Sequence, residues 1–432
     1  MSSILTNNGA TAALQTLKNI NKQMGSVQNQ ISTGKRVNSA KDNAAVWAIS
    51  KAMESDVAGF KKVSESLSLG QATISVARQG AETVTDLLTQ VKEKIVASQE
   101  ENVDRAKIQT DIEALRDQIS AVVDASQFNG QYMLKNTSTD ANSGGINVLA
   151  SIDRSFDGVT SSDIRVRKQD LGTGAASVSA SGGTFSASEA TATLNGTQTA
   201  TVDLSGVTVE AGKAFSVQIF GTDADDSSFT QADYRNSAAA AITQGEAAAT
   251  DITYVARDGD TAADVASALA NAYATYAADN GLDTNDFNMT ASGSGLTVTS
   301  GVTTATDTIA VAVASIGADA GNTIGGRLEA LSSIDVSTQA GADSALAAID
   351  GLIDTAIDSA AAFGSAEMRL ETQSEFVSGL TDALKSGIGT LVDADMEETS
   401  ARLQALQVQQ QLGIQAMSIA NSAPQSLLGL FR

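Results

Sequence analysis

The residue types that most often carry chemistry are scarce in this chain. Its 432 residues include no His and no Cys. Zinc and haem sites, thiolate nucleophiles and Ser-His-Asp triads therefore lack their usual ligands or bases. Carboxylates are plentiful, with 50 Asp and Glu residues, but nothing in the sequence marks any one pair as an acid and base couple. We expect no catalytic site, no cofactor and no metal, and hence no enzyme.

One short segment could bind phosphate. Residues Ser32 to Arg36 read STGKR and resemble the end of a phosphate-binding loop. That loop requires a second glycine five residues before Gly34, a position that Asn29 occupies here. We therefore interpret the segment as a turn between two helices.

A second segment could bind calcium. Asp223, Asp225 and Asp226 form an acidic cluster that invites comparison with the start of a calcium-binding loop. Such a loop needs Gly at its sixth position and Glu at its twelfth, and this chain has Ser228 and Tyr234 there. A solvated acidic turn is the better interpretation.

Two further features have structural interpretations or none. Trp47, the only Trp, lies among Ala and aliphatic residues, so packing explains it better than ligand stacking. Asn136, Asn195 and Asn288 begin N-x-S/T triplets. Such triplets are frequent by chance and do not by themselves show that a sugar is attached.

The overall charge excludes one class of partner. The chain has 27 basic and 50 acidic side chains, a net charge of −23. A charge of this sign repels the phosphate backbone, so we expect no nucleic acid partner. The longest apolar run is Ile309 to Ala314, far short of the roughly 20 residues that span a bilayer. We expect no membrane partner, and the first 30 residues contain no Sec-type signal peptide.

Long helices dominate the predicted structure. From Phe60 to Ile95 apolar residues recur at alternating steps of three and four, the pattern of a long helix that packs lengthwise on partners. At roughly 1.5 Å per residue this helix is about 50 Å long. The following stripe, Ile108 to Val122, predicts a helix returning beside it, which ends near a turn at Asn129 and Gly130. The predicted seam of the long helix consists of Phe60, Leu67, Ile74, Val84, Leu88, Val91 and Ile95.

Both ends of the chain repeat this periodicity. A stripe at residues 346 to 391 predicts a long helix near the C-terminus, and both extreme tails continue the pattern. Residues 1 to 45 carry five basic and one acidic side chain, and residues 393 to 432 carry two basic and four acidic ones, so the tails differ in sign. We predict that they pair and are marginally stable alone, because narrow apolar stripes bury little surface. The predicted polymerisation interface consists of Leu14, Leu17, Ile20, Met24, Val27, Ile31, Leu403, Leu406, Leu412, Met417, Ile419, Leu427 and Leu428.

Residues 171 to 326 differ in composition. They are rich in Gly, Ser, Thr, Ala and Asp and hold 3 basic and 17 acidic residues, so 3 − 17 = −14 of the net charge lies here. Alternating stretches at 197–204, 215–220, 296–299 and 309–313 predict short strands. Thr261, followed by Asp264, predicts the start of a helix. The predicted fold is therefore mainly α, a coiled-coil or helical-bundle stalk made from discontinuous N- and C-terminal halves, with an inserted, outer, variable α+β module that is rich in strands.

The two ends resemble bacterial flagellin. The likeness rests on QNQISTGKRVNSAKDNAAVWAISKAM at residues 28 to 53, SQFNGQYML at 126 to 134, and DADMEETSARLQALQVQQQLGIQAMSIANSAPQSLLGLFR at 393 to 432. It extends roughly over residues 1–170 and 327–432 and leaves the middle block out.

The resemblance implies a filament subunit for motility, exported through the flagellar type III apparatus and located outside the cell. It implies three layers: a terminal coiled coil from residues 1–45 with 393–432 that lines a hollow tube, a helical wall with small β elements from 46–170 with 327–392, and a surface-exposed outer part from 171–326. The implied partners are further copies of the chain, the flagellar cap and junction proteins, and an export chaperone on the C-terminal helices.

Two alternatives remain beside the filament subunit. A hook-filament junction protein has related terminal helices. The acidic outer module could also act as an adhesin for a surface or a glycan.

Overall fold

The structure is a computed structural model. It describes residues 7–155, 158–178, 189–195, 198–222, 252–301, 308–318 and 321–429. The chain forms two compact units: unit 1 comprises residues 1–65, 151–160 and 374–432, and unit 2 comprises residues 66–150 and 161–373. Long helices with an inserted β-containing region confirm the predicted fold class. The predicted division into three layers concerns the assembled filament and stays a prediction.

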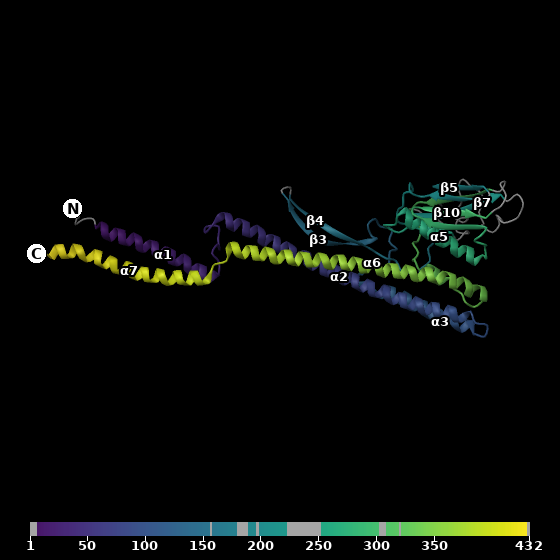
Figure 1. Ribbon diagram of the computed structural model, residues 1–432, viewed down its shortest axis with the longest axis horizontal. Helices are drawn as coiled ribbons and strands as arrows, with labels where there is room; N and C mark the ends of the chain where they lie inside the picture. The colour runs from purple at the N-terminus through teal and green to yellow at the C-terminus, as the bar shows by residue number, and fades with distance from the viewer. Residues whose placement is uncertain are drawn as a thin grey trace. The chain divides into compact units, whose positions relative to one another are not determined.

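Unit 1 contains the two terminal helices, α1 (Asn8–Thr33) and α7 (Met396–Gly429). Asn7 caps α1, because its side chain accepts a hydrogen bond from the Ala10 N–H at 3.0 Å. Asp395 caps α7 in the same way and accepts from the N–H groups of Glu397 and Glu398. The two helices run side by side (Figure 1).

Three helices form the framework of unit 2: α2 (Ala44–Ser98), α3 (Arg105–Ala125) and α6 (Gln339–Val392). The first part of α2 and the last part of α6 belong to unit 1. Asp104 caps α3, and its side chain accepts from the Lys107 N–H. Within unit 2, Arg78 on α2 forms an ion pair with Glu367 on α6 at 2.7 Å. The helices are therefore joined by polar contacts as well as by their apolar faces.

Two hairpins follow α3. Strands β1 (Gln127–Phe128) and β2 (Gln131–Tyr132) pair around the predicted turn, where Asn129 and Gly130 have φ of 51° and 77°. Strands β3 (Gly145–Ser155) and β4 (Gly158–Arg167) form a separate two-stranded sheet. Gly70 of α2 lies against this sheet, since a Cβ there would be 2.7 Å from both methyl carbons of Val148.

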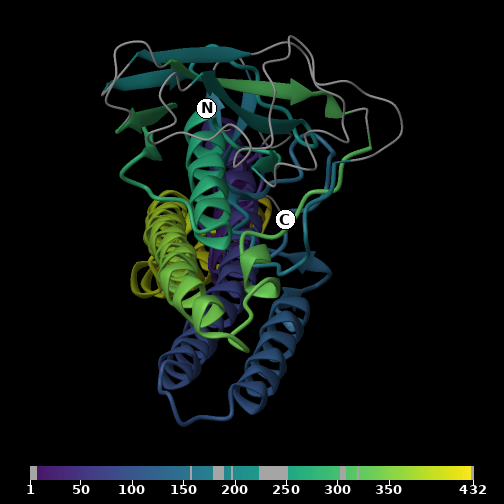
Figure 2. The ribbon, with the colours of Figure 1, turned by 90° about the vertical axis from the view of Figure 1, so that its right-hand side faces the viewer.

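In its described residues, the inserted module contains two antiparallel sheets and one helix. The larger sheet has the order β5-β11-β7-β8 and the smaller one β6-β10-β9. Helix α5 (Ala262–Asp279) packs against strands of both sheets, and Figure 2 shows the strands gathered on one side of it. The strands are β5 (Ala190–Asn195), β6 (Thr199–Asp203), β7 (Ala214–Thr222), β8 (Thr253–Val255), β9 (Phe287–Ser292), β10 (Gly295–Ser300) and β11 (Thr308–Ile316).

The core of this module is apolar and contains two rings in edge contact. Tyr273 of α5 and Phe287 of β9 have ring centroids 5.4 Å apart, and the Tyr273 hydroxyl donates to the Phe287 carbonyl at 2.7 Å. The predicted cap of α5 is present, because the Thr261 N–H and hydroxyl both donate to the Asp264 carboxylate at 2.8 Å. The module thus has a core of its own.

Candidate functional site: the paired terminal helices

Helices α1 and α7 pair antiparallel in a single register. At one end the Asn7 amide donates to the Ala420 carbonyl at 2.8 Å. Midway, the Gln410 side-chain amide donates to the side-chain oxygen Oδ1 of Asn21 at 2.7 Å. In each pair the two residue numbers add up to about 430. A constant sum is expected when two antiparallel helices keep one register along their length. The predicted pairing of the two tails is therefore present within one chain.

The backbones approach most closely at a glycine of α7. A Cβ added at Gly413 would lie 3.2 Å from the Cδ1 atom of Leu17 and 3.8 Å from that of Ile20. A larger residue at this position would push the helices apart. An isolated glycine in a helical pattern often marks such a close approach, so the sequence carried a signal for this contact.

The other end of the pair is fixed by the segments where α1 and α6 end. Gly34 closes α1 in the left-handed conformation, with φ of 67°, and its carbonyl accepts from the Ala394 N–H at 3.0 Å. The Arg36 N–H donates to the Val392 carbonyl at 2.6 Å, and the Arg36 guanidinium to the Leu391 carbonyl at 3.0 Å. The segment that resembled a phosphate-binding loop is therefore a turn between helices.

Burial divides the predicted interface residues into two groups. Val27 and Leu406 are buried, and the first group also includes the half-buried Leu17, Ile20, Met24, Ile31, Leu403 and Met417. These lie on the faces where α1 and α7 meet. Leu14, Leu412 and Ile419 form the second group and are exposed. Leu427 and Leu428 lie in α7, but their side chains are outside the described part of the structure.

The exposed apolar residues of α7 form a second stripe. Val408, Leu412 and Ile419 are 56%, 57% and 70% exposed. At about 100° per residue, these three positions lie within roughly 40° of one another, while Leu406 and Met417 lie about 160° and 180° from Val408. We call Val408, Leu412 and Ile419 the outer face of α7. The structure does not bring this face to α1.

The predicted wall-helix seam is placed differently. Leu67, Ile74, Val84, Leu88, Val91 and Ile95 of unit 2 are fully buried. Phe60, which belongs to unit 1, is half-buried. The seam is thus covered by the chain itself, and its role in a filament wall stays a prediction.

The remaining sequence candidates have no ligand-binding geometry in the described residues. Trp47 is half-buried in the first turn of α2. Asn136 is buried and only 5% exposed, so in the folded chain its triplet is not accessible for modification. Asn288 is half-buried in β9. The side chain of Asn195 and the acidic segment beginning at Asp223 are outside the described part of the structure.

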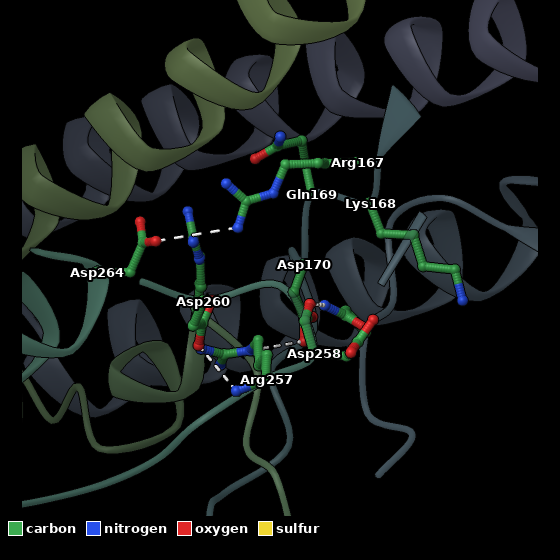
Figure 3. A pocket seen from close by; sticks show the side chains of 10 residues that line it. Arg167, Lys168, Gln169, Asp170, Arg257, Asp258, Asp260 and Asp264 are labelled. Carbon is green, nitrogen blue, oxygen red and sulfur yellow. Dashed lines mark hydrogen bonds and ion pairs between the residues drawn. The ribbon is translucent and has the colours of Figure 1, made fainter. Parts of the chain in front are cut away.

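A polar cavity of about 170 Å³ lies in unit 2 where the inserted module joins the hairpin β3–β4 (Figure 3). Its carboxylates already have partners. Asp170 pairs with Arg257 at 3.1 Å, and Asp264 with Arg167 at 3.9 Å. Asp260 accepts from the Tyr254 hydroxyl at 2.5 Å. No member of this set is left free as a general base, so the arrangement is structural.

Burial shifts the pKa of three side chains in or near this cavity. Burial raises the pKa of Tyr254, whose hydroxyl is held between Arg257 and Asp260. Burial also raises the pKa of Glu329 and lowers that of Lys168. Across the described ranges, no group of three or more acidic side chains could hold a metal ion. In the same ranges, no helix is both long and apolar enough to cross a membrane.

Two family models match the chain at its ends. Residues 4–139 match the bacterial flagellin N-terminal helical region, and residues 346–431 match the C-terminal helical region. Flagellin A of Rhizobium meliloti is 35% identical over 441 residues, with 100% of both chains covered. Flagellin FljM of Caulobacter vibrioides is 28% identical over 435 residues, covering 100% of this chain and 99% of that one.

Among solved structures, FliC of Burkholderia pseudomallei gives a TM-score of 0.28 at 15% identity, covering 69% of this chain and 99% of that one. FlgL of Xanthomonas campestris gives 0.34 at 13% identity, covering 78% and 99%. At such TM-scores neither likeness supports a conclusion.

The paired helical ends and the family matches together define a structural subunit. The chain belongs to the bacterial flagellin family. It is therefore a subunit that is exported and assembles into the helical filament outside the cell that drives motility, and it is not an enzyme.

Proposed function

We propose that the outer face of α7 is a contact surface between copies of this chain in the filament. One observation carries the proposal: α7 has apolar side chains on two opposite faces, and α1 covers only one of them. A helix that is apolar all round is normally buried. Val408, Leu412 and Ile419 become buried when a neighbouring subunit packs on this side.

The energetics support assembly as the step that completes the tails. Full burial of one Val, Leu, Ile or Met side chain is worth about 1.5 to 3 kcal/mol. In the single chain only Val27 on α1 and Leu406 on α7 gain this fully among the described apolar side chains of the two helices. Helices in proteins owe most of their stability to such packing. In a filament, neighbouring copies supply the missing burial. The paired helices α1 and α7 then line the central tube.

The decisive test is a charge on the outer face. Leu412→Asp should leave the α1–α7 pair of the monomer unchanged but raise the concentration needed for filament growth at least tenfold, because the charge enters an apolar contact. Gln409→Asp adds the same charge at an exposed polar position of the same helix and should polymerise normally. Pelleting of filaments grown from seeds measures both. Normal growth of Leu412→Asp would contradict the proposed surface.

The proposed layers have a separate test. The tube comes from residues 1–45 with 393–432, the wall from 46–170 with 327–392, and the surface from 171–326. The structure indicates where to cut, since the Gly326 N–H donates to the Gly174 carbonyl at 2.8 Å. Replacing residues 175–325 by two or three glycines keeps the buried Leu171 and Leu328. This variant should still form filaments, of smaller diameter by electron microscopy; soluble monomer alone would contradict the layers.

The uncovered outer face of α7 also suggests where other proteins bind: an export chaperone before assembly, and the cap and junction proteins at the two ends of the filament. An export chaperone that covers α7 would shield Leu412 and Ile419 until assembly. Cap and junction proteins would cover them at the two filament ends. Leu412→Asp and Ile419→Asp should then weaken chaperone binding, as measured by calorimetry, whereas Gln409→Asp should not. Equal affinities of all three variants would show that the chaperone binds another surface.

A further inference from the structure

Two segments carry the inserted module, and they pair with each other. We call residues 170–178 the entry connector and residues 321–328 the exit connector. The Leu328 N–H donates to the Gly172 carbonyl at 3.0 Å, and Ser177 and Thr323 exchange backbone hydrogen bonds at 3.1 and 2.7 Å. The connectors therefore form a short antiparallel ribbon in unit 2.

The ribbon is packed too closely for side chains at one crossing. A Cβ added at Gly326 would lie 1.8 Å from the Gly172 carbonyl oxygen. Real Cβ atoms do not approach so closely, so only glycine fits there. The close approach brings the two backbones together but does not by itself attach the module to them.

One residue of the module reaches both connectors. Arg257 lies between β8 and α5, and its side chain is 5% exposed. Its Nε donates to Asp170, the first residue of the entry connector, at 3.1 Å, and its Nη2 donates to the Gly325 carbonyl of the exit connector. Asp170 also accepts from the Gly172 N–H at 2.8 Å. Figure 3 shows the Arg257 and Asp170 side chains directed toward one another.

The same guanidinium is held from the module side. Its Nη1 donates to the Tyr254 hydroxyl at 2.6 Å, and its Cζ lies 5.3 Å from the Tyr254 ring centroid. In addition, the backbone N–H of Arg257 donates to the Asp260 carboxylate at 2.7 Å. A planar guanidinium with five fixed donors suits a position between several acceptors, which lysine could not satisfy together.

The residue after Arg257 ties the same loop to the hairpin β3–β4 and its approach. Asp258 accepts from the N–H groups of Asn142 and Gly144 at 3.0 and 2.7 Å and pairs with Arg165 at 3.5 Å. Arg167 of β4 donates to the Gly259 carbonyl. The loop that follows β8 therefore contacts both connectors and the hairpin.

A buried ion pair is weak evidence for stability, because desolvation offsets much of the attraction. Buried polar networks instead select one geometry among several. We infer that Arg257 is a positioning residue that fixes the orientation of the inserted module on its two connectors. Within a filament, this network makes every copy present its outer module at the same angle.

The test separates orientation from folding. The double variant Asp170→Asn/Arg257→Met removes both charges together, which is often close to neutral for stability, and the Asn oxygen still accepts from Gly172. Because the chain has no Cys, Ser205→Cys in the module and Ala362→Cys on α6 accept two spin labels at exposed sites. Electron-electron resonance then gives the distribution of distances between module and helix.

We expect a narrow distribution in the otherwise native chain and at least a twofold broader one in the double variant. Hydrogen exchange of β7 and β11 should stay slow, because the module keeps its own core. Arg78→Met/Glu367→Gln removes an ion pair between α2 and α6 in the same unit and should leave the distribution narrow. An unchanged width in Asp170→Asn/Arg257→Met, or loss of protection in β7 and β11, would overturn the inference, the latter because Arg257 would then act in folding.

Discussion

Helices α2 and α7 are both long and both apolar along much of their length, yet the chain covers them to different extents. In unit 2, α2 buries Leu67, Ile74 and Leu88 completely. Among the described side chains of α7, only Leu406 and Thr399 are buried. In unit 2 the first helix is covered by its own chain, whereas the second is left largely uncovered in the single chain, and we propose that other copies cover it. Apolar periodicity alone predicts both helices but does not show which of them is complete.

The largest expected effect tests the complete helix. Leu88→Ala opens a cavity in a fully buried position, so we expect a loss of about 2 to 5 kcal/mol in the free energy of unfolding of the monomer. Leu69→Ala, on the same helix but exposed, should change it by less than about 0.5 kcal/mol. Urea denaturation followed by circular dichroism measures both. Similar losses for the two variants would show that the seam is not the core of this unit.

A smaller effect tests the contact between α2 and the hairpin β3–β4. Gly70→Ala places a methyl 2.7 Å from the branched, buried Val148 side chain, and such overpacking costs typically 1 to 3 kcal/mol. Gly351→Ala, in α6 with open space around it, should instead stabilise by roughly 0.5 to 1 kcal/mol through helix propensity. Thermal unfolding of the monomers gives the two signs. If both variants were stabilised, the hairpin β3–β4 would move away from α2 at little cost in free energy.

A still smaller effect in the monomer sharpens the other side of the comparison. Leu406→Ala removes the buried apolar residue of α7, and we expect unit 2 to unfold as before. The concentration required for filament growth should rise about tenfold, equivalent to about 1.4 kcal/mol. The exposed Gln404→Ala is the matched control. If Leu406→Ala instead lowered the stability of unit 2, the two regions would not be separable.

Much of this architecture was predictable from the sequence, and the reasons differ by region. The stripe of α2 is long and regular, and those of α3 and α6 follow the same period, although the first is shorter and the second is less regular. The Thr261–Asp264 cap and the Asn129–Gly130 turn use local chemistry. Strands β3 and β4 were not predicted individually. The outward direction of Leu412 and Ile419 depends on the register with α1, which is set by Gly413 and by Asn7 with Ala420. Arg257 joins residues far apart in the chain, and no local pattern indicates such a contact.

The smallest effect concerns the connectors. Burial raises the pKa of Glu329, which accepts from the Ala176 N–H at 2.8 Å. The folded state then binds a proton more tightly than the unfolded state, so this contribution to stability is present below the unfolded pKa and is lost as pH rises through the folded pKa. Glu329→Gln keeps an acceptor without charge and should be more stable than the native chain only above that window. Unfolding free energies measured at a series of pH values check this, with Glu371→Gln at an exposed position as the control. If the difference in stability between Glu329→Gln and the native chain did not change with pH, burial of the Glu329 carboxyl would not be the cause.

The ribbon of the two connectors has a consequence for variation. The backbones of the entry and exit connectors are hydrogen-bonded to each other. A segment inserted between them therefore has to meet one geometric condition, that its first and last residues lie close together. A segment of another size or fold that meets this condition can therefore replace residues 175–325 without any change to the helices α2, α3 and α6. A foreign protein with neighbouring termini could be displayed in many regular copies by the same route.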